Sequence, residues 1–547
     1  MRKQNLFEAE LRLVVAARWE QRQDAVQQLR ALAGAFALFS QEGHVTWERS
    51  RIRRYRRAFQ PFLRRGFLLS SADVSRLWHP TTKTVNAPTL AVTESRRLEP
   101  APDFASRQMR RGDMLLGRTT FRGEGHPVRL GLQDRLRHVL MIGRTGTGKS
   151  TLMENMFLAE MQAGNGCCLI DPHGDLFETV QTLVPSDRIG DVVSFDVADR
   201  QHPLGFNILD CSDPDRFALV ADGGVSAFKK VFGLSEAETP RLISILRNSL
   251  LTLVEMPGTT LLDIGRLLTE EPYRALAIRR VSNPVVKNYW VHRFGKWTRS
   301  ERTKAVEAVL NKVDSFATTP LLQKIVGQPR NGLDLRRAMD EGQIVLVNLS
   351  KGRVGEDAAN MLGSLLVTQL QLDAMSRADI PPHDRRPFFV YIDEFQNFAT
   401  ESFPAILSEA RKFGLGLIAA HQYLDQVPRE TAKAVFGNVG TLISFQVGAD
   451  DAELLARQFS RDRGDIQERD LINLPRYHAL VRLLVDGMPT RRLTMETCAP
   501  PERQSRVTAD AIRFLFPEAK ARSPAVAASM SPLLTKESSS SPRRRAR

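Results

Sequence analysis

The feature that most constrains the fold of this chain is a glycine-rich run that follows a short apolar segment, HVLMI at 138–142. Closely spaced glycines let the backbone turn tightly enough to direct several N–H groups at one phosphate, while a lysine reaches the β- and γ-phosphates and a serine hydroxyl ligates Mg²⁺. The run therefore predicts an ATP- and Mg²⁺-binding loop between a strand and a helix. Its residues are Gly143, Arg144, Thr145, Gly146, Thr147, Gly148, Lys149, Ser150 and Thr151.

A second apolar segment, FFVYI at 388–392, ends in two carboxylates, Asp393 and Glu394. A buried strand that runs into surface acids is common, so the segment gains meaning only beside a phosphate-binding loop in the same sheet. There the aspartate can complete the magnesium shell together with Ser150, and the glutamate can orient and deprotonate the attacking water. The pair therefore predicts hydrolysis of ATP rather than simple binding.

Further polar residues follow or precede the predicted strands. Gln422 comes just after the apolar segment 416–420, where its amide could sense the γ-phosphate or could only cap a helix. Arg411 could serve a neighbouring subunit's phosphates as an arginine finger, or it could be solvated surface charge. The run DPHGD at 171–175 has no further His or Cys at ligand spacing, so we expect a structural role near the nucleotide and not a metal site.

The order of elements predicts an α/β protein with a RecA-like P-loop core and a mostly parallel sheet. Apolar strand segments alternate with helical patterns, but the strand signals stop between about 215 and 335, which predicts an inserted all-α domain. A last strand at 479–485 is expected to form a hairpin with 491–494. The predicted divisions are a basic α/β domain at 1–77, a linker at 78–111, core at 112–214 and 336–498, the insertion, and a Ser/Pro/Arg-rich, disordered tail at 499–547.

The charge balance favours a polyanionic partner. The chain has 77 Lys and Arg against 62 Asp and Glu, a formal charge of +15, which suits nucleic acid, an anionic membrane surface or solubility alone. In the first domain a strand is expected at 11–16 and a helix at 22–39. The segment 51–65, RIRRYRRAFQPFLRR, could follow a phosphate backbone with its aromatics stacked on bases, or it could be one solvated helical face above a core.

Two further observations bear on the compartment. The four cysteines match no zinc or redox spacing, and no stretch reaches the roughly 18 apolar residues needed to cross a bilayer. The start of the chain, Met1-Arg2-Lys3, is not typical of a signal peptide. We therefore expect a cytoplasmic protein with no transmembrane segment of its own, which could be held at the inner membrane only by a partner.

The motifs GRTGTGKST, LIDPHGDL, FVYIDEFQNF and SEARKFGLGLIAAHQYLDQV occur in this order over roughly residues 112–496. The combination resembles the FtsK/HerA superfamily of ring-forming DNA pumps, and most closely its type IV secretion coupling protein branch, the TraG/TraD-like conjugation ATPases. The resemblance implies a homo-hexamer with ATP bound between subunits and DNA in a central channel. Relaxase and type IV secretion components are the implied partners, and the inserted helices resemble the all-α domain at the ring entrance.

The resemblance also implies roles for single residues. Lys149 and Ser150 match the Walker A pair, Asp393 and Glu394 match the Walker B pair, and Gln422 matches the sensor. Arg411 and Arg137 match basic positions that act on the site of the neighbouring subunit.

One departure from this family leaves the function open. Conjugative coupling proteins usually carry an amino-terminal membrane anchor, where this chain has the basic segment instead. An ATP-driven DNA translocase in conjugative transfer is the leading hypothesis. A soluble HerA-like ATPase that works with nucleases, a protein-secretion motor and a nucleotide-gated scaffold are the alternatives.

Overall fold

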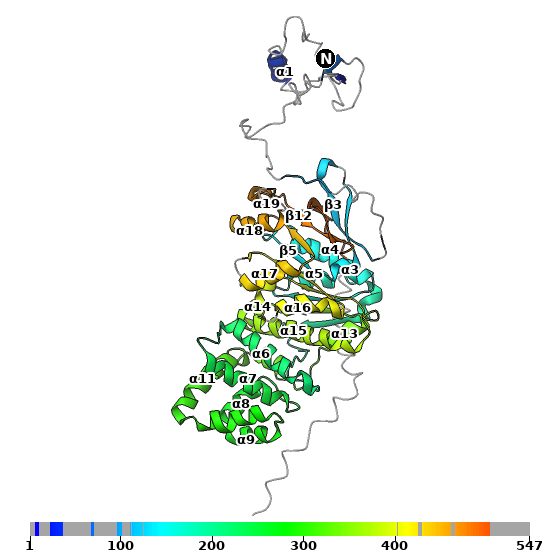
Figure 1. Ribbon diagram of the computed structural model, residues 1–547. Coiled ribbons are helices and arrows are strands. Elements are labelled where there is room, and N and C mark those ends of the chain that lie inside the picture. The colour runs from blue at the N-terminus through cyan, green and yellow to red at the C-terminus, as the bar shows by residue number, and fades with distance from the viewer. Residues whose placement is uncertain are drawn as a thin grey trace, which may run out of the picture. The chain divides into compact units, whose positions relative to one another are not determined.

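The computed structural model describes residues 6–9, 22–36, 67–70, 96–100, 110, 112–123, 125–401, 403–424, 429–460 and 465–503 (Figure 1). The chain divides into two units, 1–92 and 93–547. In the first unit β1 (Leu6–Ala9) pairs with β2 (Phe67–Ser70) as an antiparallel ribbon, and α1 spans Arg22–Phe36. The helix predicted at 22–39 is thus present over 22–36, and residues 37–39 lie outside the described residues. The predicted strand at 11–16, the arginine-rich segment 51–65 and most of the predicted linker and tail lie outside the described residues.

The second unit is built on an eleven-stranded sheet with the order β4-β3-β15-β12-β11-β5-β10-β9-β6-β8-β7. The strands from β11 to β7 run parallel to one another, whereas β12, β15, β3 and β4 extend the sheet in antiparallel fashion. The mostly parallel α/β fold predicted for the core is confirmed. The strands are β3 (Met114–Thr119), β4 (Pro127–Leu130), β5 (Val139–Ile142), β6 (Gly166–Asp171), β7 (Val192–Asp196), β8 (Ile344–Asn348), β9 (Phe388–Ile392), β10 (Leu415–His421), β11 (Thr441–Ser444), β12 (His478–Arg482) and β15 (Leu493–Thr497).

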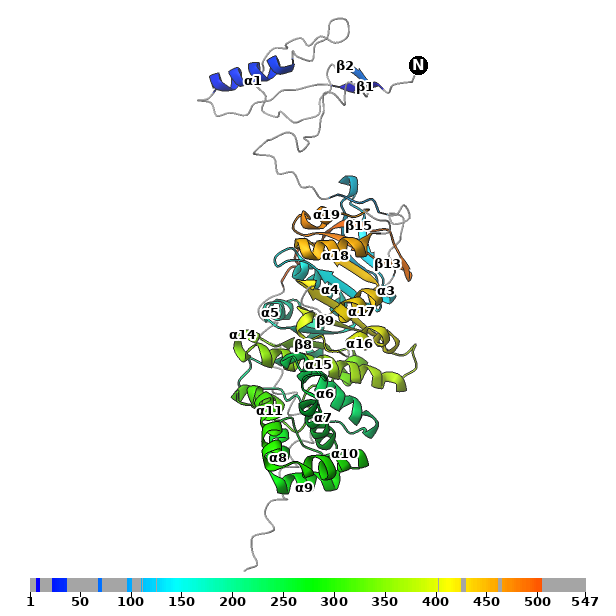
Figure 2. The ribbon, with the colours of Figure 1, turned by 60° about the vertical axis from the view of Figure 1, so that its left-hand side comes forward.

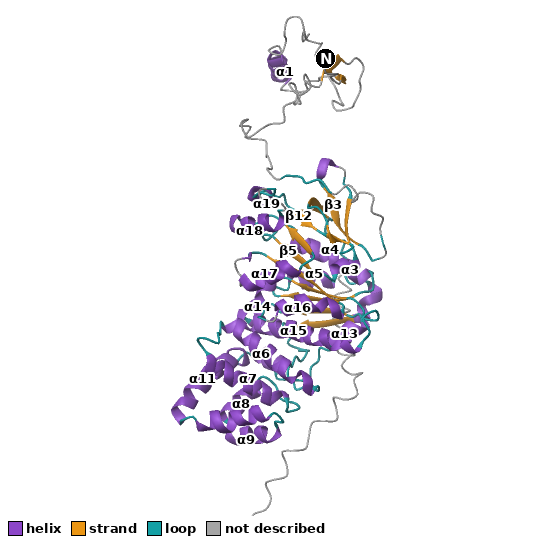
Figure 3. Cartoon of the chain, in the orientation of Figure 1, coloured by secondary structure: helices purple, strands orange, loops and turns teal. Residues whose placement is uncertain are grey.

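Helices cover both faces of this sheet because alternate residues of each strand point to opposite sides. In β5, Val139 and Met141 join one hydrophobic cluster, and Leu140 and Ile142 join the other. The first cluster contains α4 (Lys149–Gln162) and α5 (Asp175–Gln181). The second cluster contains α13 (Leu335–Glu341), α15 (Glu356–Ser376), α16 (Phe403–Glu409), α17 (Arg429–Asn438), α18 (Ala449–Phe459) and α19 (Glu468–Ile472) (Figure 3). The shorter helices are α3 (Leu132–Arg135) and α14 (Lys351–Val354).

The segment between β7 and β8 is helical, as the sequence predicts. A buried aromatic cluster organises it: Trp290 packs edge-on against Tyr289 and Phe294, and its indole N–H donates a 2.8 Å hydrogen bond to the Thr252 hydroxyl. Its helices are α6 (Phe217–Phe232), α7 (Pro240–Val254), α8 (Asp263–Thr269), α9 (Glu271–Arg280), α10 (Pro284–Asn288), a π-turn at Tyr289–Arg293, α11 (Arg299–Ala317) and α12 (Pro320–Val326) (Figure 2).

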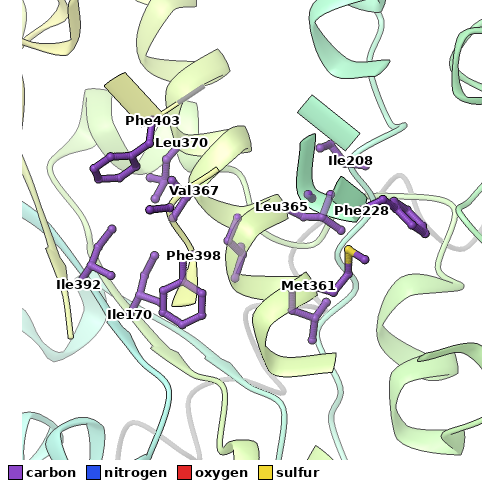
Figure 4. Packing of buried hydrophobic residues seen from close by; sticks show 14 of the residues in the cluster. Ile170, Ile208, Phe228, Met361, Leu365, Val367, Leu370, Ile392, Phe398 and Phe403 are labelled. Carbon is purple, nitrogen blue, oxygen red and sulfur yellow. The ribbon is translucent and has the colours of Figure 1, made fainter. Parts of the chain in front are cut away.

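Helix α15 joins this helical insertion to the sheet. One side of α15 meets Ile170 and Ile392 of the sheet together with Phe398, and Met361 on its other side meets Phe228 of α6 (Figure 4). The helix is therefore a shared layer, apolar on both sides. Any movement of the insertion against the sheet must act on it.

The antiparallel part of the sheet differs from the sequence-based expectation. The predicted pairing of the last strands is confirmed, since β12 pairs with β15, although the tip forms its own ribbon of β13 (Leu484–Val485) and β14 (Met488–Pro489). Strands β3 and β4 were not predicted. They contain Arg118 and Arg129 among short apolar stretches, and Gly117 lets β3 approach Glu496 so closely that a β-carbon would lie 2.1 Å from the Glu496 carbonyl oxygen.

Within the described part of the chain, no helix combines the length and apolar character that crossing a bilayer requires.

A buried histidine fixes the start of the central strands. His138 Nδ1 accepts a hydrogen bond from the Leu417 N–H at 3.0 Å, so Nε2 carries the proton and donates to the Leu407 carbonyl at 2.9 Å. The ring therefore links β5, β10 and α16 in its neutral form. Burial lowers the pKa of His138 from 6.5 to about 4, and the positive charge of Arg411 acts in the same direction.

We expect this imidazole to make stability depend on pH. As pH falls below 6.5, His138 becomes protonated in the unfolded state but stays neutral in the folded state until the pH approaches 4, so protonation favours unfolding. The free energy of unfolding should therefore drop by ~2 kcal/mol between about pH 7.5 and pH 5 through this residue alone. Urea denaturation of wild type and His138→Asn at both pH values measures this. An equal pH dependence in the two proteins would contradict the assignment.

Candidate active site

Three strand ends meet at one edge of the sheet because β10 lies between β5 and β9 and runs parallel to both. In register, His421 at the end of β10 pairs with Ile142, the last residue of β5, and Ala419 pairs with Ile392, the last residue of β9. The glycine-rich loop, the two carboxylates and Gln422 therefore follow neighbouring strands at the same edge. Ligands in parallel α/β sheets bind outside such carboxyl ends.

The loop 143–150 has the backbone that its glycines predict. Gly146 and Gly148 have φ angles of 76° and 123°, which side-chain-bearing residues rarely adopt. Lys149 begins α4, and its ammonium group donates to the Gly143 carbonyl and, at 3.2 Å, to the Arg144 carbonyl. These two hydrogen bonds close the loop around the lysine.

The rest of the loop is exposed to solvent on one side and hydrogen-bonded to the protein backbone on the other. Arg144, Thr145 and Gly146 are exposed. At the start of α4, Ser150 is exposed and Thr151 is half-buried. The opposite side is held by neighbouring strand ends. The Tyr477 N–H donates to the Thr147 carbonyl at 2.8 Å, and the Arg144 N–H donates to the Gln446 carbonyl at 2.9 Å.

The carboxylates lie within electrostatic reach of this lysine. Burial raises the pKa of Asp393 to about 7, helped by the negative charges of Glu394 and Asp171 and opposed by Lys149. Burial also lowers the pKa of Lys149, which Asp393 and Glu394 oppose. Carboxylate and hydroxyl oxygens are the donors that Mg²⁺ prefers. Asp393 and Ser150 therefore fit the metal role predicted for them. A divalent cation bound there would reduce the repulsion between Asp393 and the two neighbouring carboxylates.

Asp171 has the structural role expected from the sequence. Its carboxylate accepts hydrogen bonds from the N–H groups of His173 at 2.8 Å and Phe177 at 2.9 Å, which fixes the turn between β6 and α5. No group of three or more His, Cys, Asp or Glu side chains arranged for a metal ion occurs among the described residues.

The two predicted arginines lie away from these groups. Arg411 is exposed in the 3₁₀ turn Ala410–Phe413 before β10, and Arg137 precedes β5, where its guanidinium donates to the Gly487 carbonyl at 3.3 Å. Both are at the amino ends of strands, and the seven residues of β10 span roughly 23 Å. Within one chain they cannot complete the site, so their predicted role requires a neighbouring copy. That role, and the sensor role of half-exposed Gln422, stay predictions.

Three polar residues beside the site were not predicted from the sequence. His421 is fully buried, its ring packs edge-on against Phe395 with centroids 5.2 Å apart, and neither ring nitrogen has a hydrogen-bond partner within the protein. Burial lowers its pKa to about 3, and the charges of Lys149 and Lys230 add to this. Lys230, from α6 of the insertion, also lines a cavity of about 310 Å³ together with Gln396. A polar residue inside an apolar run, as in IAAHQ, was the available signal.

We expect replacement of His421 by phenylalanine to stabilise the nucleotide-free protein. The change removes two buried, unpaired nitrogens and keeps an aromatic ring on Phe395, so the free energy of unfolding should rise by ~1 kcal/mol. Urea denaturation measures it, with His138→Phe as the matched control. That variant should lose stability because it leaves the Leu417 N–H and the Leu407 carbonyl unpaired. A loss of stability in both variants would contradict the prediction.

Comparison with solved structures gives the same fold. The bacterial conjugative coupling protein TrwB in an unbound form matches with a TM-score of 0.55 and 17% identity, over 75% of this chain and 94% of that one. TrwB in complex with a non-hydrolysable GTP analogue matches with a TM-score of 0.56 over 75% and 95%, and TrwB in complex with ADP and Mg²⁺ with 0.54 over 76% and 95%, each at 17% identity. No curated protein matches the chain.

Two family models match consecutive parts of the sequence. The model of the helicase HerA central domain matches residues 115–370, which include the glycine-rich loop and the helical insertion. The model described as the TraM recognition site of TraD and TraG matches residues 387–470, which include Asp393, Glu394 and Gln422. The chain therefore carries a HerA-type central domain followed by a domain of the TraD and TraG type, which confirms its predicted resemblance to the FtsK/HerA superfamily and the TraG/TraD-like coupling proteins.

Proposed function

We propose that the chain is an ATP-driven DNA translocase that acts as the coupling ATPase of conjugative, type IV secretion transfer. The observation that carries the proposal is the division of the site across the sheet. Lys149, Asp393 and Glu394 lie at the carboxyl edge, while Arg137 and Arg411 lie at the amino edge, where only another copy's nucleotide could reach them. An ATPase built this way works as a ring, which we propose is a hexamer.

The proposed chemistry follows from the residues at the carboxyl edge. When bound, Mg²⁺ would be held by Ser150 and Asp393 and would neutralise the charge that develops on the phosphates. Lys149 exchanges the loop carbonyls for phosphate oxygens, and the loop N–H groups bind the phosphates. Glu394 orients the attacking water and takes its proton. Gln422, next to this edge, contacts the γ-phosphate.

The cargo is inferred from the family models and from charge. A DNA partner agrees with the helicase HerA model over 115–370 and with the formal charge of +15. Relaxase and other type IV secretion components are the further proposed partners. A HerA-like, DNA-processing ATPase is the second candidate, because the HerA model matches 115–370.

We expect DNA to raise the ATPase rate of the purified protein several-fold at low salt. The stimulation should fade steeply as salt rises, because binding to phosphates releases counterions. The measurement is steady-state hydrolysis with single-stranded and duplex DNA over a salt series, with Lys149→Ala as the background. Unchanged hydrolysis with every DNA at low salt would remove DNA as the cargo and favour a protein-secretion motor.

We also expect Lys149→Ala chains to inhibit wild-type chains when the two are mixed. Each inactive copy would interrupt the site it shares with its neighbour, so activity at equal amounts should fall well below half of the wild-type rate. The measurement is the ATPase rate of mixtures of wild-type and variant chains. Arg411→Ala chains, which keep Lys149, should inhibit the wild-type chains in the same way. Activity that falls only in proportion to dilution would mean that each copy hydrolyses ATP alone.

A further inference from the structure

The carboxylate of Glu394 accepts a hydrogen bond from the turn that follows it. The side-chain amide of Gln396 donates a 2.6 Å hydrogen bond to Glu394 Oε2, and both side chains are buried. Hydrogen bonds to an ionised acceptor are short and strong compared with neutral ones. The oxygen that accepts this bond is occupied and cannot at the same time accept a proton from an attacking water along that direction.

The backbone at this point is also held in an uncommon conformation. Glu394 has φ 49° and ψ 49°, in the left-handed region that residues with a side chain rarely occupy, and the 3₁₀ turn Phe395–Asn397 follows directly. Such conformations persist only where the surroundings support them, and they gather at switch regions. The bond from Gln396, two residues along the same turn, is one such support.

The lining of one cavity brings together the Gln396 amide and a second acceptor. Asn360, in the first turns of α15, lines the same 310 Å³ cavity as Gln396, and its side-chain carbonyl oxygen is buried without a hydrogen-bond partner. Buried acceptors without a partner are rare because they lose their bonds to water and gain nothing in return. Transfer of the amide from Glu394 to Asn360 would satisfy this oxygen.

The cavity connects the turn with the helical insertion. The cavity is lined by two residues from each of three segments: Lys230 and Val231 of α6, Glu356 and Asn360 of α15, and Gln396 and Asn397 of the turn after β9. Because α15 packs on α6 on one side and on the sheet on the other (Figure 4), a displacement of the insertion changes the distance between the two acceptors of the amide.

We propose that Gln396 is a positioning residue for ATP hydrolysis: its amide holds Glu394 in a resting conformation and releases it on moving to Asn360. The proposal rests on the ATPase activity proposed above and adds a resting state to it. Release of Glu394 lets both carboxylate oxygens face the attacking water. Hydrolysis is thereby coupled to the position of α15, which the helical insertion controls.

The test is the steady-state ATPase rate without DNA in Gln396→Met, which keeps the side-chain volume and removes the amide. We expect kcat to rise at least about fivefold, since a hydrogen bond to a charged group is lost from the resting state only, while KM for ATP stays unchanged. Asn397→Ala is the matched control, because Asn397 lines the same cavity from the same turn and no hydrogen bond of its side chain to Glu394 occurs. Its kcat should equal that of wild type.

Two substitutions of Asn360 should act in opposite directions. Asn360→Asp offers the amide a charged acceptor and should raise the DNA-free kcat, whereas Asn360→Ala removes the acceptor and should lower the DNA-stimulated kcat. A merely structural role of Asn360 would lower both. This pair decides the question if Gln396→Met fails to fold, which its melting temperature reveals.

The outcomes separate this proposal from the proposed function. A DNA-free kcat in folded Gln396→Met equal to or below that of wild type overturns the role of Gln396. If the DNA-free kcat rises in Gln396→Met while DNA fails to stimulate the wild-type protein, the role of Gln396 is supported and DNA as the cargo is overturned. If Gln396→Met hydrolyses ATP and the wild-type protein does not, the role of Gln396 is also supported. If neither protein hydrolyses ATP, both proposals are overturned.

Discussion

The hydrogen-bonded ladder of β5, β10 and β9 is the constraint on which the site depends. Because β10 pairs with both neighbours, its register sets the height at which the phosphate loop, the carboxylates and Gln422 leave the sheet. A shift by two residues would displace one loop by about 6–7 Å. Gly416 helps to fix the register, since a β-carbon there would lie 2.7 Å from the ring of Phe389.

Around this ladder the chain gathers groups that are unfavourable in the absence of a ligand. Lys149, Glu394 and Asp171 are buried, and Asp393 is crowded by two other carboxylates. Such groups lose their hydration without full compensation from one another. Apolar packing on both faces of the sheet therefore provides the stability of the fold. The buried pair of Arg135 and Glu160, whose Nε and Oε1 atoms are 2.9 Å apart, positions the phosphate-loop helix against the segment before β5.

The fold class and the chemistry at the strand ends could be predicted from local patterns. The phosphate loop and the strand before Asp393 carry their own signals, since glycines that need unusual φ angles and runs of apolar residues are visible in the sequence. Strands β3 and β4 could not be predicted, because they are held by partners distant in the chain, such as the backbone of Glu496. The place of β10 between β5 and β9 also depends on pairing that chain order does not give.

Single site residues divide along the same line. Asp393 and Glu394 follow from a strand that ends in acids, but Gln396 and Asn360 gain significance only because α15 passes beneath the turn. His421 was not predicted as a site residue, although Gln422, the next residue, was. Strand alternation turns the His421 ring to the face of Phe395, toward the helical insertion.

The two ends of the sheet carry different parts of the chain. The helical insertion leaves between β7 and β8 at one end. Strands β15 and β3 lie near the other end, where the Leu98 N–H donates to the Thr494 hydroxyl of β15 and the Cys498 N–H donates to the Leu116 carbonyl of β3. A pulling force between the insertion and these segments would act across the strands, along the direction of the backbone hydrogen bonds. The strand pairs would then carry the load in series, so the weakest pair would set the largest force that the sheet can transmit.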